Sequence, residues 1–390
     1  MSEKLTMKYL LLQPWFSAPG HPAQSLIRTY RAIYDYIQPE VIVYKSHTDH
    51  HTQILEEYIY ESNASTITDW RLQKVFNDPL ATGTVALIKY ISKHYSKPKD
   101  LSIFFLDSNL YILSFIIRLY PIKPQRLNVL CMVAPDFYQR NKFSSLTKWF
   151  LVKKLFSLPF FYLYLRTPEL AKAWQEELPE YADKIQYLPS LELYGSKFHH
   201  TSKISNACQI KKFVVAGQIR PQKSVDILFT LFDNCQLNIG YLKIAGKIVG
   251  SDLSHKLSQK KSHNVTIIDQ FLSEDQMKDI LSDCHYNLML YTDDWDNRME
   301  SSMLFESMKY GCPIIAFEGG WLGNTVQKEK IGWTIRRDQI GELSNILANL
   351  PHPATDEYQA ILDNLNRSHN IWSSAEIVHI FLNKLGWDKI

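Results

Sequence analysis

The sequence is poor in the features that mark membrane-spanning, disulfide-rich or nucleic-acid-binding proteins. Its longest apolar runs fall short of the ~18 residues of a transmembrane helix, and the short apolar run near the N-terminus does not predict a signal peptide. The 43 basic and 40 acidic residues give a formal charge of only +3, which provides no electrostatic argument for nucleic acid. The five cysteines are odd in number and scattered, which favours a reducing cytoplasm over a disulfide framework.

Metal-ligand patterns are also scarce. The histidine-rich stretch from His47 to His51 has no Cys or acid pattern beside it, so we interpret it as a solvated loop. Asp293 and Asp294 are contiguous and do not form the Asp-x-Asp spacing of a metal-bound diphosphate site. The sequence therefore predicts no metal site.

The features that are present indicate a two-domain α/β protein. A chain of 390 residues exceeds the size of one ordinary core. Short apolar runs alternate with helical stretches in both halves, which is typical of parallel sheets covered on both faces. The runs expected to form strands are Tyr9–Leu12, Val41–Tyr44, Ile103–Leu106, Val129–Val133 and Phe160–Leu165, then those within residues 211–217, 241–247, 264–269, 286–291 and 313–317.

The domain boundaries are placed at a polar stretch that shows neither the helical nor the strand periodicity of apolar residues. We predict an N-terminal Rossmann-like domain over 1–193, a linker over 194–208 and a C-terminal Rossmann-like domain over 209–390, whose last helix packs back on the N-terminal domain. The predicted fold class is α/β, with two doubly wound domains facing a cleft.

Ligands of open α/β sheets bind at the carboxyl ends of the strands. In VVAGQIRPQKS, Gly217 directly follows a strand and Lys223 stands where a helix begins, with Arg220 between them. Glycine permits close backbone approach, and cations near a helix N-terminus suit a diphosphate. Taken alone, the pattern is more often that of a solvated surface lysine.

Two further features point to the same edge. Ser301 and Ser302 begin a helix whose free N–H groups could bind phosphate, and Glu306 follows within it, where an acid could accept hydrogen bonds from a ribose diol. Gly319 and Gly320 follow the next strand and offer a second point of backbone approach. An exposed helical Glu and an ordinary turn are the plain alternatives.

The order of these motifs resembles a known family. The segments GQIRPQKSVDIL, LKIAGK, NVTIIDQFLSEDQMKDILSDC, ESMKYGCPIIAFEGG and IGWTI, over about residues 210–337, resemble the nucleotide-binding half of GT-B glycosyltransferases, especially the large family 4-like bacterial group. The resemblance implies that Lys223 contacts the diphosphate of a UDP-sugar or GDP-sugar donor, that Glu306 holds the ribose, and that no cofactor is needed.

The sequence departs from that family at two positions. Members usually carry a second Glu eight positions before the equivalent of Glu306, where this chain has Arg298. The basic residue that usually follows the first Gly is replaced by Gln218. Arg298 is expected to meet an acidic sugar or the diphosphate instead, and the sequence leaves open whether the anomeric configuration inverts or is retained.

An inverting mechanism needs a general base for the acceptor hydroxyl. The resemblance implies that the N-terminal domain supplies it. Asp136 follows the carboxyl end of one predicted strand and is the first candidate; Asp107 follows another and is the second. His21, in the loop after the first strand, is the third. Each of the acids could equally be a helix cap.

The stretch from Phe143 to Leu165 mixes lysines with apolar residues. Lys148, Lys153 and Lys154 leave a broad apolar helix face carrying Leu146, Phe150 and Leu151, which is typical of a helix in a membrane interface. A helix docked on its own sheet, followed by a buried strand, fits equally.

Together, these features predict a metal-independent hexosyltransferase of polysaccharide or glycoconjugate synthesis, acting on a glycan or lipid-linked acceptor. We expect it in the cytoplasm at the inner face of the cell membrane, with peripheral contact through 143–165 and no nucleic-acid partner. The alternatives that stay open are a sugar-nucleotide epimerase or phosphorylase, and a catalytically silent nucleotide-sugar-binding subunit. The donor sugar, nucleotide base, acceptor and oligomeric state are not readable from the sequence.

Overall fold

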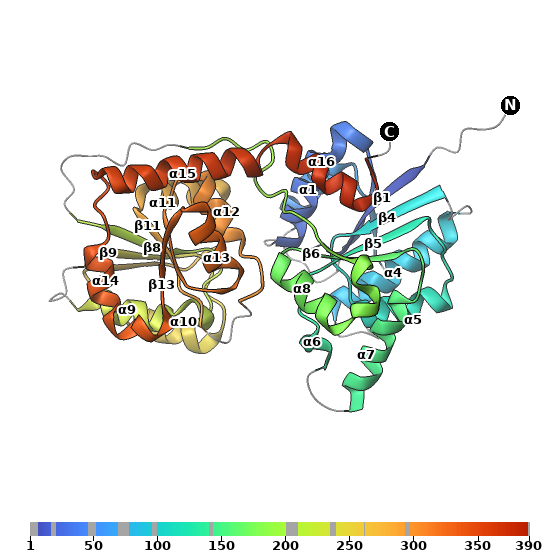
Figure 1. The fold of residues 1–390 in the computed structure, drawn as a ribbon, viewed down its shortest axis with the longest axis horizontal. Helices are drawn as coiled ribbons and strands as arrows, with labels where there is room; N and C mark the ends of the chain where they lie inside the picture. The colour runs from blue at the N-terminus through green and yellow to red at the C-terminus, as the bar shows by residue number, and fades with distance from the viewer. Residues whose placement is uncertain are drawn as a thin grey trace. The chain divides into compact units, whose positions relative to one another are not determined.

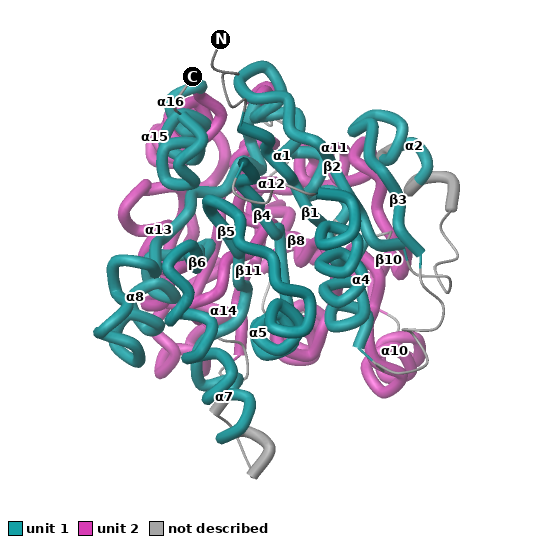
Figure 2. Tube along the Cα trace, turned by 90° about the vertical axis from the view of Figure 1, so that its right-hand side faces the viewer, with its two compact units in different colours: residues 1–194, 375–390 teal, residues 195–374 magenta. Residues whose placement is uncertain are grey.

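The computed structural model describes residues 7–16, 21–45, 52–68, 78–95, 100–139, 143–199, 210–234, 239–260, 262–292 and 297–388. The chain divides into two compact units (Figure 2). Unit 1 comprises residues 1–194 and 375–390, and unit 2 comprises residues 195–374.

Unit 1 is built on a seven-stranded sheet in the order β3-β2-β1-β4-β5-β6-β7, in which all neighbours pair in parallel. Its strands are β1 (Lys8–Phe16), β2 (Glu40–Lys45), β3 (Ser65–Ile67), β4 (Leu101–Phe105), β5 (Arg126–Cys131), β6 (Phe161–Leu165) and β7 (Ile185–Tyr187). Its helices are α1 (His21–Ile37), α2 (Thr52–Ser62), α4 (Pro79–His94), α5 (Leu110–Leu119), α6 (Asp136–Gln139), α7 (Phe143–Phe156), α8 (Pro168–Glu177), the 3-10 helix η2 (Pro179–Lys184) and α16 (Ala375–Leu385).

Unit 2 is built on a six-stranded parallel sheet in the order β10-β9-β8-β11-β12-β13. Its strands are β8 (Lys212–Ala216), β9 (Tyr241–Ala245), β10 (Val265–Ile268), β11 (Tyr286–Met289), β12 (Ile314–Phe317) and β13 (Gly332–Ile335). Its helices are α9 (Val225–Asp233), α10 (Ser251–Ser258), α11 (Glu274–Asp283), α12 (Ser302–Lys309), α13 (Gly320–Glu329), α14 (Leu343–Asn349) and α15 (Asp356–Trp372), with 3-10 helices η3 (Pro221–Lys223) and η5 (Arg337–Glu342).

Both predicted doubly wound units are present, with helices on both faces of each sheet (Figure 1). The strands form where apolar residues run without interruption, because both faces are covered: every residue of β4, β11 and β12 is buried. Helix starts follow local capping chemistry. Ser273 and Gln276 of the sequence SEDQ form a capping box at the start of α11.

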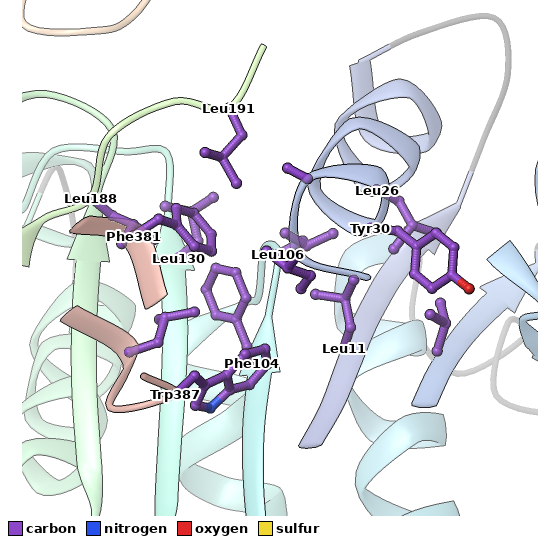
Figure 3. Close-up of a cluster of buried hydrophobic side chains, with 14 of the residues drawn as sticks. Leu11, Leu26, Tyr30, Phe104, Leu106, Leu130, Leu188, Leu191, Phe381 and Trp387 are labelled. Carbon is purple, nitrogen blue, oxygen red and sulfur yellow. The ribbon is translucent and has the colours of Figure 1, made fainter. Parts of the chain in front are cut away.

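The end of the chain belongs to unit 1. The Tyr164 hydroxyl donates to Lys384 O at 2.6 Å, and the Arg126 guanidinium donates to the same carbonyl at 2.9 Å, which satisfies the last turn of α16. Phe381 and Trp387 are fully buried beside Phe104 of β4 (Figure 3). The prediction assigned 209–390 to the C-terminal domain while expecting the last helix on the N-terminal one; these contacts place the chain from Ala375 onward in unit 1.

The region predicted as a membrane contact or a docked helix, 143–165, forms α7 followed by the strand β6. Phe161, Leu163 and Leu165 of β6 are fully buried, so the second part of this region is core. None of the described helices is both long and apolar enough to cross a bilayer.

Candidate functional site

The candidate site of unit 2 lies where the strand order reverses. β8 and β11 are neighbours, and the chain leaves them for opposite directions across the sheet. In open parallel sheets the loops at the carboxyl ends of such a pair form a crevice where ligands bind. The loop after β8 contains Gly217 and Lys223, and the segment after β11 contains Tyr291 and Thr292.

Gly217 has a backbone conformation that a residue with a side chain would adopt only with strain. Its φ is +84°, and an added Cβ would lie 2.8 Å from Met303 Sδ and 3.4 Å from Lys223 Nζ. The Gly217 carbonyl in turn abuts Gly246 at the end of β9, where a Cβ would lie 1.7 Å from that oxygen. The backbone at Gly217 is therefore held beside Lys223 and the first turn of α12.

Lys223 is folded inward at the end of η3. Its side chain is 9% exposed, and Nζ donates a hydrogen bond to the carbonyl of Ala216, the last residue of β8. Burial, with a smaller contribution from the positive charge of Arg220, lowers the pKa of Lys223 to about 7. The amine is thus close to half-protonated at neutral pH and would gain a proton when an anion arrives.

Arg220 lies close to the same groups. It is exposed and donates a hydrogen bond to Gln218 Oε1, so Gln218 orients this cation. Burial raises the pKa of Tyr291 to about 12, while the Ser301 hydroxyl and the charge of Arg220 act in the opposite direction. Arg220, Lys223 and Tyr291 therefore share one electrostatic environment.

The helix whose start was predicted to bind phosphate is α12. Ser301 is its N-cap residue, but its side chain does not cap the helix; Ser301 Oγ shares a 2.9 Å hydrogen bond with the Tyr291 hydroxyl. Ser302 is the first helical residue. Glu306 is half-buried, about 6 Å along the axis from Ser302. It stands three positions after Met303, so it shares the face of α12 that meets Gly217.

The two glycines after β12 differ in role. Gly319, at φ +79°, has no atom within 4 Å of an added Cβ, so its backbone is open on that side. An added Cβ on Gly320 would lie 2.4 Å from Asn297 O, and that carbonyl accepts a 2.8 Å hydrogen bond from Trp321 N. Gly320 therefore serves close packing, and only Gly319 is left as an open approach point.

Arg298 directly follows Asn297 and is half-buried. Because Asn297 is fixed against the first turn of α13, Arg298 lies in the segment between that turn and the N-terminus of α12. The candidate metal residues His47–His51 and Asp293–Asp294 lie outside the described residues.

Sequence reasoning named Arg220, Lys223 and Arg298 and missed a fourth cation. Arg337 begins η5, two residues beyond β13, and its Nη1 donates to Tyr291 O at 3.0 Å while its guanidinium stands 4.6 Å from the centre of the Phe317 ring. The available signal was its place after a strand's carboxyl end, the same rule that identified Gly217.

Two buried polar atoms at this edge lack partners within the part of the chain that the structure describes. They are Gln222 Oε1 and Thr292 Oγ1. Their residues are joined by a 2.7 Å hydrogen bond from Thr292 N to Gln222 O. Buried polar atoms without partners are rare in native proteins, and a bound ligand or water would satisfy them.

In unit 1, the three predicted catalytic candidates follow three adjacent strands. His21 begins α1 after β1, Asp107 follows β4, and Asp136 begins α6 after β5. The strand order of unit 1 reverses between β1 and β4, so Asp107 lies at the switch point, whereas Asp136 lies one strand away. Asp136 is half-buried, and only the backbone position of His21 is described.

Asp107 lies in a buried environment that perturbs its carboxyl group. Ser108 N donates to Asp107 Oδ1 at 2.8 Å. Burial of the carboxyl group raises its pKa to about 7, and the nearby Asp78 raises it further, while the Ser108 hydrogen bond lowers it. Asp78 is fixed in turn by the Asn109 side-chain amide at 3.0 Å and by Leu80 N. A carboxyl group that titrates near pH 7 can accept a proton from a hydroxyl.

Solved structures of GT-B glycosyltransferases share this fold. Anabaena HepE in complex with UDP-glucose aligns with a TM-score of 0.70 at 15% identity, over 97% of this chain and 99% of that chain. TarM aligns with a TM-score of 0.67 at 11% identity over 99% of both chains. The α,α-trehalose 6-phosphate synthase of Burkholderia multivorans aligns with a TM-score of 0.62 at 9% identity, over 98% of this chain and 96% of that chain.

No protein-family model matches the sequence, and no curated protein matches it either. The structural likeness extends over nearly the whole chain, and it defines the class: this is a protein with the GT-B fold. The predicted fold is therefore confirmed.

Proposed function

We propose that this protein is a glycosyltransferase that moves a sugar from a nucleoside-diphosphate sugar to an acceptor hydroxyl. The observation that carries the proposal is the convergence of Gly217, Lys223, the start of α12 and the open Gly319 at the carboxyl edge of unit 2. A glycine backbone that a ligand can approach closely, a buried amine and the N-terminus of a helix are features that suit a diphosphate.

Lys223 and Arg220 would stabilise the departing diphosphate. The pKa of Lys223 lies close to neutral pH, so a bound diphosphate would raise that pKa and hold the added proton beside the phosphate oxygens. Charge that develops on the leaving group is then met by groups already in place, without a metal ion. Arg337, held by Tyr291 O and Phe317, would add a positioned cation at the same edge.

Glu306 would hold the ribose. A half-buried carboxylate can accept hydrogen bonds from both hydroxyls of a diol. HepE was solved with UDP and with UDP-glucose, which makes a UDP-hexose the first donor to examine.

On the acceptor side, we propose Asp107 as the base, with Asp136 and His21 as the other candidates. Its place at the switch point of unit 1 and its pKa near 7 support this choice over Asp136. We also propose a glycan or lipid-linked acceptor of polysaccharide or glycoconjugate synthesis, a location at the inner face of the cell membrane, and peripheral membrane contact within 143–165.

A thermal-shift panel of UDP, GDP, ADP, CMP and dTDP tests the donor site. A nucleotide at a hundred times its Kd stabilises the folded state by about 2.7 kcal/mol, so one member should raise the melting temperature clearly. Glu306→Ala should remove that shift, whereas the exposed Glu342→Ala should keep it. If no nucleotide shifts the wild type, the proposed donor site is wrong.

The second candidate is a catalytically silent binding subunit, which Arg298 favours because it stands where the resembling family carries an acid. Incubation with the sugar conjugate of the binding nucleotide separates the candidates. Transfer releases nucleotide only when an acceptor is added, an epimerase converts the donor without one, and a silent subunit binds the donor and leaves it intact.

A further inference from the structure

Three neighbouring helices of unit 1 expose large apolar side chains. The exposed fractions are 52% for Phe115 and 58% for Leu119 on α5, 64% for Phe137 on α6, and 69% for Leu146 and 55% for Phe150 on α7. Both α5 and α6 pack against α7, and Figure 1 shows the three together on one side of the sheet of unit 1. An exposed group of this kind marks an interaction surface.

The helix α7 is apolar on two opposite faces. Val152, Leu155 and Phe156 are fully buried and dock the helix on unit 1. Leu146 and Phe150, four residues apart, lie on the other face and point away from the core. The sequence predicted one apolar face on this helix. Because the buried face alone accounts for the packing of α7 on unit 1, the outer apolar residues need a separate explanation.

The outer apolar face continues onto α5. Tyr111, Phe115 and Leu119 stand at i, i+4 and i+8, so they share one stripe of that helix. Lys148 Nζ of α7 lies 5.1 Å from the centre of the Tyr111 ring, which joins the stripe to α7. We call the outer residues of α5, α6 and α7, with their cations, the basic-apolar face.

The charge of this part of the chain is one-sided. Residues 108–168 contain nine of the 43 basic residues and one of the 40 acids, which leaves 34 basic and 39 acidic residues elsewhere. Arg118, Lys123, Lys153 and Lys154 are exposed. None of these four forms an ion pair with a described residue. Lys154 Nζ lies 5.3 Å from the Phe150 ring centre, so cation and aromatic ring stand together.

We propose that the basic-apolar face docks on an anionic lipid bilayer. Exposed apolar side chains enter the headgroup boundary, and the lysines beside them meet anionic headgroups. A second copy of the same face would bring like charges together, and a soluble polyanion would leave Leu146 and Phe150 in water. A bilayer satisfies both parts of the face.

The position of α6 connects this face with the proposed function, on which this step rests. Phe137 is exposed on the basic-apolar face, and it directly follows Asp136, the only acid of residues 108–168. Docking would bring the bilayer next to the acceptor side of unit 1. An acceptor anchored by a lipid could then stay in the membrane while its polar head reaches the site.

Co-sedimentation of the full chain with vesicles tests the proposal. Phosphatidylcholine vesicles are compared with vesicles of phosphatidylcholine and phosphatidylglycerol in equal parts, at low and high salt. We expect binding to the anionic vesicles that weakens with salt. Lys153→Gln with Lys154→Gln should lower the partition coefficient about 25-fold, because each lysine contributes about five-fold. Lys172→Gln with Lys328→Gln, whose side chains are 76% and 83% exposed, should leave it unchanged.

The apolar part has its own matched pair. Phe150→Ser should weaken binding about ten-fold or more even at high salt. Ile371→Ser on unit 2, where the residue is 54% exposed, should have no effect. Equal binding to both vesicle types, no binding, or equal losses in test and control variants would overturn the proposal, and so would a dimer that Phe150→Ser dissociates.

The nucleotide panel keeps this test separate from the donor site. Glu306→Ala should lose its nucleotide shift and still bind anionic vesicles, while the Phe150 and lysine variants should keep their shift. A wild-type protein that does not bind anionic vesicles but still shows the nucleotide-induced rise in melting temperature would refute the membrane proposal and leave the donor-site proposal standing.

Discussion

Replacing Lys223 by methionine should stabilise the protein and abolish donor binding. A lysine whose pKa falls from 10.5 in the unfolded chain to about 7 in the folded state is held against its preference for water. Each pKa unit corresponds to about 1.4 kcal/mol, so at pH 7 the penalty is about 4 kcal/mol. Methionine removes that penalty but also loses the hydrogen bond to Ala216 O, worth about 1 kcal/mol. The expected net gain is about 3 kcal/mol.

The pH dependence of this gain is the sharper test. Because the folded pKa is depressed, the unfolded chain binds a proton between pH 7 and 10.5 that the folded chain lacks, so wild-type stability rises with pH over that window. The penalty is fully present below pH 7. The advantage of Lys223→Met should therefore shrink by about 2 kcal/mol between pH 7 and pH 9.

Urea unfolding of both proteins at pH 7 and 9 measures this difference. Lys328→Met is the matched control, because its side chain is 83% exposed and should change stability little at either pH. The same samples are titrated with the nucleotide that shifts the wild type, which Lys223→Met should no longer bind. A destabilised Lys223→Met protein, or an advantage that does not change with pH, would refute the account of Lys223 as a buried, ligand-ready amine.

Three further changes have expected outcomes. Burial raises the pKa of Asp107 to about 7, so the folded state holds a proton that the unfolded chain loses above pH 4, and stability falls as pH rises from 4 to 7. Asp107→Asn should remove this fall in a pH series of melting temperatures, and an unchanged slope would contradict the prediction. Gly319→Ala should lower the free energy of unfolding by about 1–3 kcal/mol, because a φ of +79° with a ψ of 175° suits only glycine. Gly341→Ala, also in open space, should lower it by almost nothing, and equal urea midpoints for the two variants would argue against this backbone conformation at Gly319. Trp387→Ala should reduce the free energy of unfolding by about 3–5 kcal/mol and lower the unfolding midpoint of unit 1, although the residue follows unit 2 in the chain. A loss of stability confined to unit 2 would contradict the placement of residues 375–390 in unit 1.

Much of the fold is encoded locally. Uninterrupted apolar stretches such as Leu101–Phe105 form strands because parallel sheets are covered on both faces, and Ser273 starts α11 by its own capping hydrogen bonds. The glycine after β8 and the helix start at Ser301 are identified from strand ends alone, since all parallel strands deliver their carboxyl ends to one edge.

Other properties depend on residues distant in sequence. Lys223 is an ordinary loop lysine by sequence, and its low pKa arises only when β8, Arg220 and α12 enclose it. Ser301 is an obvious cap, yet its hydroxyl bonds Tyr291 instead, because folding brings the end of β11 to that helix. Local signals cannot report such proximity.

The strands, the helix starts and the glycines at the sheet edge can thus be predicted from the sequence, because they follow from hydrophobic period, capping and backbone freedom over a few residues. Which of these groups share an environment depends on how the chain packs. This packing buried Lys223 and Asp107, brought Arg337 to Tyr291, and turned one face of α7 outward while its other face docked. Burial and proximity are properties of the packed chain, and desolvation and charge act only after packing has set them.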